Sequence, residues 1–324
     1  MTEKIQVPPL HALWETWELE MVDQLSSATC KRYRSVFHRF TDWFILVERR
    51  LPELDDLHPV TMVGYRSWLQ ETCAASTTNT HLSALRSWFN WLVEYKHLDT
   101  HPALRLKLVR QQPQPAPAAL HPKQVNALLR AAQQTRYPQR NTAILQMMLQ
   151  TGMRIGECAA LQWGDIGLGE RKGIVSIRAG KGNHVRRVPL NQSIRQALAE
   201  YLAPILGVGN SLREVAAVWP QKSSPAPLWR SERDSRLSVR EMSRMIHDLV
   251  QVCAARDLLP ADTTPHALRH TFSTRYLVRH PGDLVGLAWL LGHSSVHTTQ
   301  VYVQPTEEEM AERVSQIDLN AYAD

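Results

Sequence analysis

Hydrophobic positions along this 324-residue chain recur mainly at three- and four-residue intervals, the spacing of helices that have one apolar side. Upstream of residue 110 the pattern is clearest in two stretches: Tyr33, Val36, Phe37, Phe40 and Phe44, and then Leu82, Leu85, Trp88, Phe89, Leu92 and Val93. An apolar helix side is stable only when it packs against another element. This part of the chain is therefore predicted to be a small all-helical bundle.

Downstream of residue 120 the pattern alternates between helix and strand. Helices are predicted over residues 125–132, 142–150, 238–252, 268–278 and 283–290. Gly292 is the natural C-cap of the last one. Residues 173–178 and 185–190 have the composition of strands, and they flank the hairpin-like turn Ala179-Gly180-Lys181-Gly182-Asn183. The second part is thus predicted to be mainly α with a small antiparallel β-sheet, and Lys181 is expected at the hairpin tip.

A proline-rich stretch, Gln111-Gln112-Pro113-Gln114-Pro115-Ala116-Pro117-Ala118-Ala119, separates the two parts. Alternating prolines favour extended polyproline II at ~3.1 Å per residue, so about ten residues span roughly 30 Å. A chain of this length can bury two cores. We expect domains at 1–110 and 121–305, a linker at 111–120 between them and a tail at 306–324.

Composition is that of a soluble globular protein, with 44% hydrophobic and 21% charged residues. The sequence has no run of about 18 apolar residues and its N-terminus does not resemble a signal peptide, which indicates a cytoplasmic location. The cysteines stand singly, with no Cys-x-x-Cys pair, and we interpret them as reduced packing residues: Cys30, Cys73, Cys158 and Cys253.

Positive charge is concentrated in the second part of the chain. Residues 1–110 hold 13 Lys/Arg against 13 Asp/Glu, residues 111–306 hold 23 against 12, and the tail from Glu307 holds 1 against 6. An excess of this kind attracts a polyanion and suits binding to a phosphate backbone. A solvated basic surface is the alternative.

Six residues in the second part together match the needs of phosphodiester chemistry: Arg154, Lys181, His266, Arg269, His293 and Tyr302. Two guanidinium groups can clamp phosphate oxygens, a tyrosine can attack phosphorus, and lysine and histidine can move protons, so the reaction requires no metal. Each residue alone has an ordinary alternative; Arg154, for example, can be a surface charge paired with Glu157. Only the complete set favours catalysis.

A metal site is not indicated by the histidines of this segment. His266 and His270 have the spacing of two ligands on one helix face, but the residues between them lack the glutamate of a metalloprotease helix. Arg269, which lies between them, would repel a cation. We therefore expect no metal site here.

Four motifs follow one another along the second part: Thr151-Gly152-Met153-Arg154-Ile155-Gly156-Glu157; Gly180-Lys181-Gly182-Asn183; His266-Ala267-Leu268-Arg269-His270-Thr271-Phe272; and Leu291-Gly292-His293-Ser294-Ser295, then Thr298, Thr299 and Tyr302. In this order they resemble the motifs of tyrosine recombinases of the phage integrase and Xer type. The resemblance covers both parts of the chain. It implies an N-terminal helical core-binding, SAM-like domain and a C-terminal catalytic domain, which together form a C-shaped clamp on DNA.

The resemblance also implies that no cofactor is needed, and it implies a role for each matching residue. Tyr302 is implied as the nucleophile that forms a 3′-phosphotyrosyl link, Arg154 and Arg269 as the phosphate clamp, and Lys181 as the general acid. His266 and His293 are implied as supporting proton donors or acceptors, with Glu157 in a structural role. The implied activity is site-specific recombination, for integration, excision or resolution of a mobile or circular DNA element.

The partners that the resemblance implies are double-stranded DNA with an inverted-repeat core site and three further copies of the chain, as a homo-tetramer in the synaptic complex. Accessory DNA-bending proteins can belong to such an assembly, and the expected location is cytoplasmic and nucleoid-associated. Pro305 interrupts any helix through Tyr302, and the acidic, amphipathic tail has the form of a new helix. We expect this tail to dock onto a neighbouring protomer or to fold back onto its own domain.

Several interpretations stay open at the level of sequence. Four cations on the helix predicted around residues 33–44 either face DNA phosphates or merely solvate the helix: Lys31, Arg32, Arg34 and Arg39. The arginine-rich stretch 207–240 is either a DNA-facing loop or a solvated insertion. A type IB topoisomerase and a DNA-binding protein without strand exchange are the alternative functions.

Overall fold

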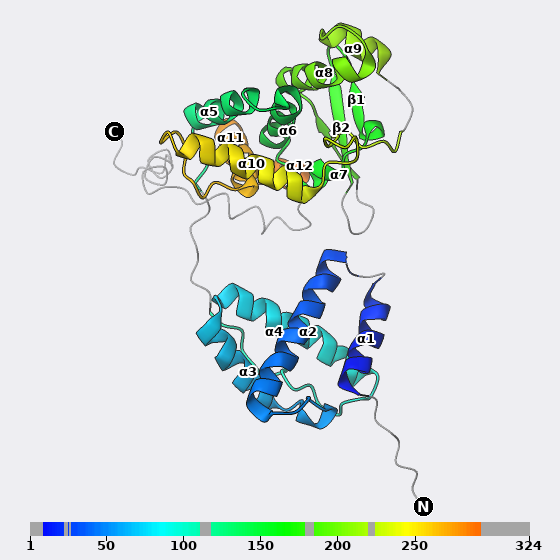
Figure 1. Cartoon of the computed structure of the whole chain (residues 1–324), viewed down its shortest axis with the longest axis vertical. Coiled ribbons are helices and arrows are strands. Elements are labelled where there is room, and N and C mark those ends of the chain that lie inside the picture. Colours follow the sequence, from blue (N-terminus) through cyan, green and yellow to red (C-terminus); the bar gives the residue numbers. More distant parts are fainter. Residues whose placement is uncertain are drawn as a thin grey trace, which may run out of the picture. The chain divides into compact units, whose positions relative to one another are not determined.

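The computed structural model describes residues 9–22, 25, 27–110, 118–178, 185–219 and 224–292. The chain divides into two compact units, Met1–Gln114 and Pro115–Asp324, and each has a hydrophobic core of its own. Figure 1 shows the helical N-terminal unit and the C-terminal unit with its sheet. The prediction of a mainly α protein with a small antiparallel sheet is confirmed.

The N-terminal unit is built from four helices and one 3-10 turn among its described residues. They are α1 (Leu10–Met21), α2 (Ser27–Glu48), η1 (Leu54–Asp56), α3 (Pro59–Thr72) and α4 (Ala75–Glu94). The two apolar stripes predicted from the sequence lie on α2 and α4. Proline at the first position of α3 satisfies its preference for a helix start.

Aromatic rings form the centre of this first core. Trp14 of α1 stacks on Phe37 of α2 with ring centroids 4.5 Å apart, and it meets Trp88 of α4 edge-on at 5.1 Å. Such ring pairs contribute about 0.5–1.5 kcal/mol each beyond the burial of their surface. Phe37 and Trp88 also meet edge-on at 5.5 Å, so the stripes of α2 and α4 pack on each other and on α1, a helix that the sequence pattern did not predict.

The C-terminal unit is a helical assembly around a short sheet. Its described helices are α5 (Pro122–Gln133), α6 (Pro138–Thr151), α7 (Ile155–Ala160), α8 (Gln192–Leu206), α9 (Leu212–Val218), α10 (Val239–Ala254), α11 (Pro265–Arg279) and α12 (Leu284–Leu291), with a 3-10 turn η2 (Trp163–Asp165). The strands are β1 (Ile166–Leu168), β2 (Gly173–Arg178) and β3 (Val185–Pro189). The two predicted strands are confirmed as β2 and β3, whereas β1, only three residues long, was missed.

The sheet is antiparallel in the order β1-β2-β3. Val175 of β2 lies opposite both Ile166 of β1 and Val188 of β3, and all three side chains are buried. Because side chains alternate between the two faces of a strand, this register also turns Arg186 toward the buried face. Residues 179–184 between β2 and β3 lie outside the described residues.

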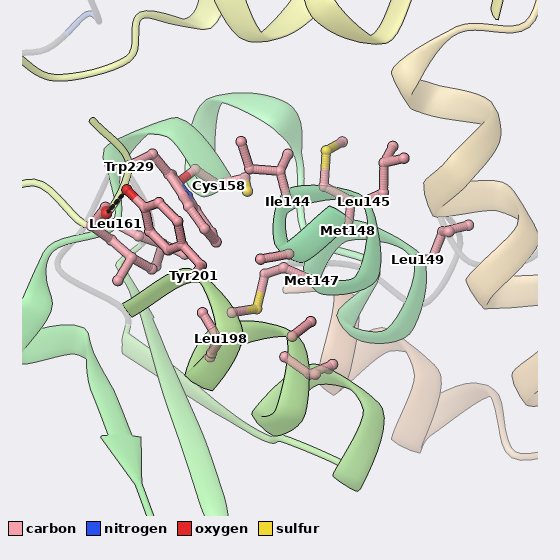
Figure 2. Packing of buried hydrophobic residues seen from close by; sticks show 14 of the residues in the cluster. Ile144, Leu145, Met147, Met148, Leu149, Cys158, Leu161, Leu198, Tyr201 and Trp229 are labelled. Carbon is pink, nitrogen blue, oxygen red and sulfur yellow. Dashed lines mark hydrogen bonds between the residues drawn. The ribbon is translucent and has the colours of Figure 1, made fainter. Parts of the chain in front are cut away.

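Helix α6 runs through the middle of the second core. Most of its residues are buried, which explains why its sequence is apolar around much of its circumference. Figure 2 shows Met147 of this helix near Leu198, and Ile144 on the side of the rings of Tyr201 and Trp229. The end of this rigid helix is where the candidate site begins.

Part of the stretch 207–240, left open by the sequence, belongs to this core. Trp229 is fully buried, and its Nε1–H donates to the backbone oxygen of Cys158 at 2.9 Å (Figure 2). Arg236 donates from Nη1 to the backbone oxygen of Ala160, at the end of α7, at 2.8 Å. The interpretation of a solvated insertion is therefore wrong for Trp229, which closes the core beside α7, whereas Arg236 is exposed and binds at the edge of that core.

Across the described residues, no helix combines the length and the hydrophobicity that crossing a membrane requires.

The two cysteines of the C-terminal unit, Cys158 and Cys253, are buried packing residues. Burial raises the pKa of the Cys158 thiol to about 12, and burial also raises that of Cys253. Both thiols are free in the structure.

Candidate active site

Arg154 stands at the turn between α6 and α7. Helix α6 ends at Gly152, which adopts a left-handed conformation with φ of 64°, and Arg154 is the N-cap of α7. Its backbone N–H donates to Glu157 Oε2 at 2.7 Å and its Nη1 donates to Glu157 Oε1 at 3.2 Å. Half of the arginine side chain is still exposed. Its guanidinium is thus oriented by one carboxylate and remains open to a ligand on the surface.

Arg269 is held inside the protein. It lies on α11, is 2% exposed, and donates from Nη1 to the backbone oxygen of Gly152 at 2.6 Å and from Nη2 to that of Leu291 at 2.9 Å. These oxygens belong to the C-terminal ends of α6 and α12, where the helix dipole is negative. A guanidinium has five N–H donors, and these two bonds use two of them. Arg269 therefore joins two helix ends.

His266 lies one turn before Arg269 on α11 and is exposed. Partial desolvation, followed by the positive charges of Arg269 and Arg154, lowers the pKa of its imidazole below the ordinary value. Arg269 and Arg154 therefore both disfavour the charged form of this imidazole. A neutral imidazole at neutral pH can accept a proton.

Arg186 is a site residue that sequence reasoning missed. It is 7% exposed on β3, and its Nη1 and Nη2 donate to Glu157 Oε1 and Oε2 at 3.0 and 2.8 Å. Its Nε donates to the backbone oxygen of Leu290 at 2.8 Å. The signal was present in the strand pattern, since Val188 facing inward places Arg186 inward as well, and a buried charge requires a partner.

Glu157 links these arginines. Burial alone would raise the pKa of its carboxyl, but the hydrogen bonds and charge of Arg186, with a contribution from Arg154, outweigh burial and hold that pKa below its ordinary value. Glu157 is therefore ionised and shared between two guanidinium groups. Three arginines against this one carboxylate leave the group Arg154, Glu157, Arg186, His266 and Arg269 positively charged, as an anion-binding site requires.

Three of the six predicted catalytic residues, Lys181, His293 and Tyr302, lie outside the described residues, as does the tail 306–324. The other three, Arg154, His266 and Arg269, are brought together from α7 and α11 together with Glu157. Within the part of the chain that the structure describes, no group of three His, Cys, Asp or Glu side chains is arranged to hold a metal ion.

Comparison with known proteins identifies the family. Residues 118–309 match the model of the phage integrase family, and residues 15–96 match that of the phage integrase N-terminal SAM-like domain. The chain belongs to the phage integrase family. The matches cover both units, so the helical bundle is the SAM-like domain and the arginine-containing unit is the integrase catalytic domain.

Curated relatives of this integrase-family chain are named tyrosine recombinases. Tyrosine recombinase XerC of Rhodospirillum centenum is 31% identical over 308 residues, which cover 92% of this chain and 83% of the relative. XerC of Myxococcus xanthus is 33% identical over 269 residues, covering 82% and 83%. The resemblance to tyrosine recombinases inferred from the four motifs is thereby confirmed.

Solved structures share the integrase fold at low sequence identity. A Tn1549 transposon integrase in complex with a circular intermediate DNA superposes with a TM-score of 0.72 at 19% identity, covering 94% of this chain and 98% of that one. A lambda integrase dimer bound to a COC′ core site superposes with a TM-score of 0.65 at 18% identity, covering 90% and 97%. These likenesses establish the fold.

The four basic residues predicted to face DNA on α2 differ in their surroundings. Arg34 pairs with Glu18 of α1 at 2.8 Å. Arg39 lies over the Trp68 ring at 5.3 Å and donates from Nη2 to Cys73 Sγ at 3.1 Å. Lys31 and Arg32 are exposed and make no ion pair with the described residues of the SAM-like domain. Only these last two present a cation that is not engaged within the domain.

Proposed function

We propose that this protein is a site-specific DNA recombinase that cuts and rejoins strands through a 3′-phosphotyrosyl intermediate, with Tyr302 as the nucleophile. One observation carries the proposal. Arg269 binds the carbonyl of Gly152, two residues before Arg154, and the carbonyl of Leu291 at the end of α12, and His266 lies one turn before it on α11. The segment that contains His293 and Tyr302 follows α12 directly in sequence.

In the proposed reaction the Tyr302 oxygen forms a bond to phosphorus while the bond to the 5′ oxygen of the next nucleotide breaks. Tyrosine has an ordinary pKa of about 10, so a base must take its proton, and neutral His266 is suited to do so. Lys181 donates a proton to the leaving 5′ oxygen, and His293 supports these transfers. The covalent link conserves the energy of the phosphodiester bond, and a 5′ hydroxyl from another strand reverses the reaction.

The arginines act on the phosphate during this attack. Negative charge grows on the non-bridging oxygens in the transition state, and guanidinium groups fixed in advance stabilise it more than they stabilise the ground state. Arg154, exposed but oriented by Glu157, contacts one side of the phosphate. Arg269, fixed by two helix ends, supplies charge from the interior, and its rigidity lowers the cost of reorganisation.

The assembly that we propose is a homo-tetramer on two double-stranded DNA sites, each an inverted-repeat core, with or without accessory DNA-bending proteins. We assign residues 1–110 to core binding, 111–120 to the linker, 121–305 to catalysis and 306–324 to docking of a tail helix on a neighbouring protomer. Lys31 and Arg32 are the cations of α2 that we propose for phosphate contact. The biological outcome is integration, excision or resolution of a mobile or circular DNA, in the cytoplasm on the nucleoid.

The first test uses the full chain, the Tyr302→Phe variant and end-labelled DNA from the native locus that carries a candidate inverted repeat. Wild type is expected to leave a covalent adduct on a 3′ phosphate after denaturation, and Tyr302→Phe none, because phenylalanine lacks the attacking oxygen. Tyr95→Phe, at a half-exposed position in the SAM-like domain, is the matched control and should form the adduct.

Other outcomes of the same experiment identify the alternatives. Specific and tight binding by wild type without any adduct would replace the proposal by a DNA-binding protein of this fold. Relaxation of a supercoiled plasmid that lacks the repeat, dependent on Tyr302, would replace it by a type IB topoisomerase activity.

A further inference from the structure

We propose that Arg186 is a positioning residue for strand cleavage, which holds Arg154 in its working orientation through Glu157 and fixes the end of α12. The inference rests on the proposed function, because it concerns the same site. Arg186 does not reach the reacting atoms in this account and acts only through its neighbours. Its three hydrogen bonds connect α7, whose N-cap is Arg154, with the end of α12, after which His293 and Tyr302 follow in sequence.

Each of the three nitrogens of the Arg186 guanidinium donates a hydrogen bond. Two nitrogens bind both oxygens of Glu157 side by side, and Nε binds the Leu290 carbonyl. Parallel N–H bonds to one carboxylate fix orientation as well as distance, which a lysine cannot do. Gly292 packs directly on this group, since a Cβ there would lie 2.7 Å from Arg186 Nη1. A larger residue at 292 would displace the guanidinium.

Arg186 controls how strongly Glu157 competes for Arg154. Glu157 Oε1 accepts from Nη1 of both arginines, at 3.0 Å from Arg186 and 3.2 Å from Arg154. Oε2 accepts from Arg186 Nη2 and from the Arg154 backbone. With Arg186 present, the negative charge is divided, and Arg154 remains available to a phosphate. Without it, the whole charge of Glu157 would act on Arg154 and compete with the DNA.

The contact to α12 concerns the nucleophile. The carbonyls of Leu290 and Leu291, consecutive in the last turn of α12, are bound by Arg186 and Arg269 respectively. The helix then ends at Gly292 with φ of 66°, and His293 is the next residue. Two arginines from different elements therefore fix the point from which the chain continues to Tyr302. Arg186 also lies five residues after Lys181 in sequence, on strand β3.

The experiment compares full-length Arg186→Met, Arg186→Lys and the double variant Arg186→Met with Glu157→Gln. Arg187→Met is the matched control, because Arg187 is exposed on the opposite face of the same strand. Thermal unfolding, binding to the DNA site and the single-turnover rate of adduct formation are measured for each. Arg186→Met is expected to bind the site as wild type does and to form the adduct about 100-fold more slowly, the cost of a misplaced reacting group.

The double variant separates positioning from folding. Arg186→Met leaves the Glu157 carboxylate buried without its main partner and should lower the unfolding temperature, whereas glutamine at 157 removes that charge and should restore it. Adduct formation is expected to stay slow in the double variant, because the contacts to Leu290 and to both Glu157 oxygens are still missing. If adduct formation recovers together with thermal stability, or if folded Arg186→Met cleaves at the wild-type rate, the proposal is wrong.

Arg186→Lys tests whether the planar guanidinium group itself is needed. It replaces Arg186→Met in the comparison if that variant does not fold. Lysine keeps the positive charge beside Glu157 but cannot bind both of its oxygens and Leu290 at once. We expect it to unfold near the wild-type temperature and to form the adduct more slowly than the Arg187→Met control. A wild-type rate for Arg186→Lys would show that charge alone is sufficient and would overturn the positioning role.

A readout that does not depend on catalysis distinguishes failure of this inference from failure of the proposed function. The side-chain Nε–H resonance of Arg154, assigned with Arg154→Lys, reports its pairing with Glu157. It is expected to shift in Arg186→Met and to remain in place in Arg187→Met. If wild type forms no Tyr302-dependent adduct but the resonance shifts in Arg186→Met, the recombinase proposal fails, while the effect of Arg186 on the Arg154–Glu157 pair stands. An unchanged resonance in Arg186→Met refutes that effect.

Discussion

Individual side chains at the site are placed by charge as much as by packing. Glu157 accepts hydrogen bonds from a backbone N–H and from two guanidinium groups, and Arg269 binds carbonyls at the ends of α6 and α12, where a helix leaves such oxygens without an intrahelical partner. These contacts fix the cations before DNA binds. The positive charges of Arg269 and Arg154 act on His266, so the pKa of its imidazole reports on the electrostatics of the site.

The imidazole pKa of His266 is predicted to lie below its ordinary value of 6.5, because desolvation and then Arg269 and Arg154 disfavour its charged form. The unfolded chain then binds more protons than the folded one as pH falls below 6.5. The contribution of neutral His266 to folding stability is fully present above pH 6.5. It is lost as the pH falls through the lowered pKa of the folded state.

NMR titration of the His266 ring, assigned with His266→Gln, measures this pKa. In Arg154→Met one of the two charges is gone, and the pKa is expected to rise toward the ordinary value. A wild-type pKa at or above 6.5, or no change in Arg154→Met, would contradict the electrostatic account.

At the scale of elements, the site is assembled from helix ends. Helices α6 and α12 both end in a left-handed glycine, Gly152 and Gly292, and Arg269 on α11 bonds to a carbonyl at each of these ends. Strand β3 and the N-terminus of α7 meet there through Arg186 and Glu157. Because α6 and α12 both end at a sharp turn of the chain, their ends can lie close to β3 and to the N-terminus of α7 without steric overlap.

Gly152→Ala is predicted to destabilise the catalytic domain by about 2–5 kcal/mol. The left-handed backbone costs a residue with Cβ about 1–2 kcal/mol, and the added methyl would collide with the Phe272 ring and lie 2.8 Å from Leu291 Cδ2, an overpacking cost of about 1–3 kcal/mol. Denaturant unfolding gives the free energy.

Gly207→Ala is the control for this substitution. Gly207 ends α8 with nearly the same backbone angle, φ of 67°, but a Cβ there would meet no atom within 4 Å. It should lose only about 1–2 kcal/mol. Equal losses for the two variants would show that contact with Phe272 and Leu291 is not what requires glycine at position 152.

For the whole molecule, the separation into two cores is the main feature. The N-terminal core draws only on residues 10–106 and is dominated by aromatic rings, whereas the C-terminal core draws only on residues 118 and beyond and is mainly aliphatic. A cooperative unit of folding requires a shared core. The chain is therefore expected to unfold in two steps.

Leu85→Ala and Leu198→Ala test this expectation in the full chain. Leu85 is 1% exposed in the first core and Leu198 is fully buried in the second, so each truncation should cost about 2–5 kcal/mol. Differential scanning calorimetry should show two transitions, with Leu85→Ala lowering only one of them and Leu198→Ala only the other. A single transition that both variants lower equally would mean that the units unfold together.

The sequence by itself determined the features that depend on neighbours along the chain. Helical spacing located α2 and α4, strand composition located β2 and β3, and Gly292 marked the end of α12. Periodicity and turn chemistry are local, so they can be seen without a structure. The motifs around Arg154 and His266 were recognisable for the same reason, because each occupies one short segment.

Only the tertiary structure decided which distant residues meet. Glu157 and Arg186 are 29 positions apart, and nothing local marks them as partners. The burial of Arg269 against two helix ends and of Trp229 beside Cys158 likewise depends on where whole elements pack. The physical reason is that burying a charge or an indole N–H costs free energy unless the group finds hydrogen-bond partners. Those partners come from distant segments, so they are set only when the core is assembled.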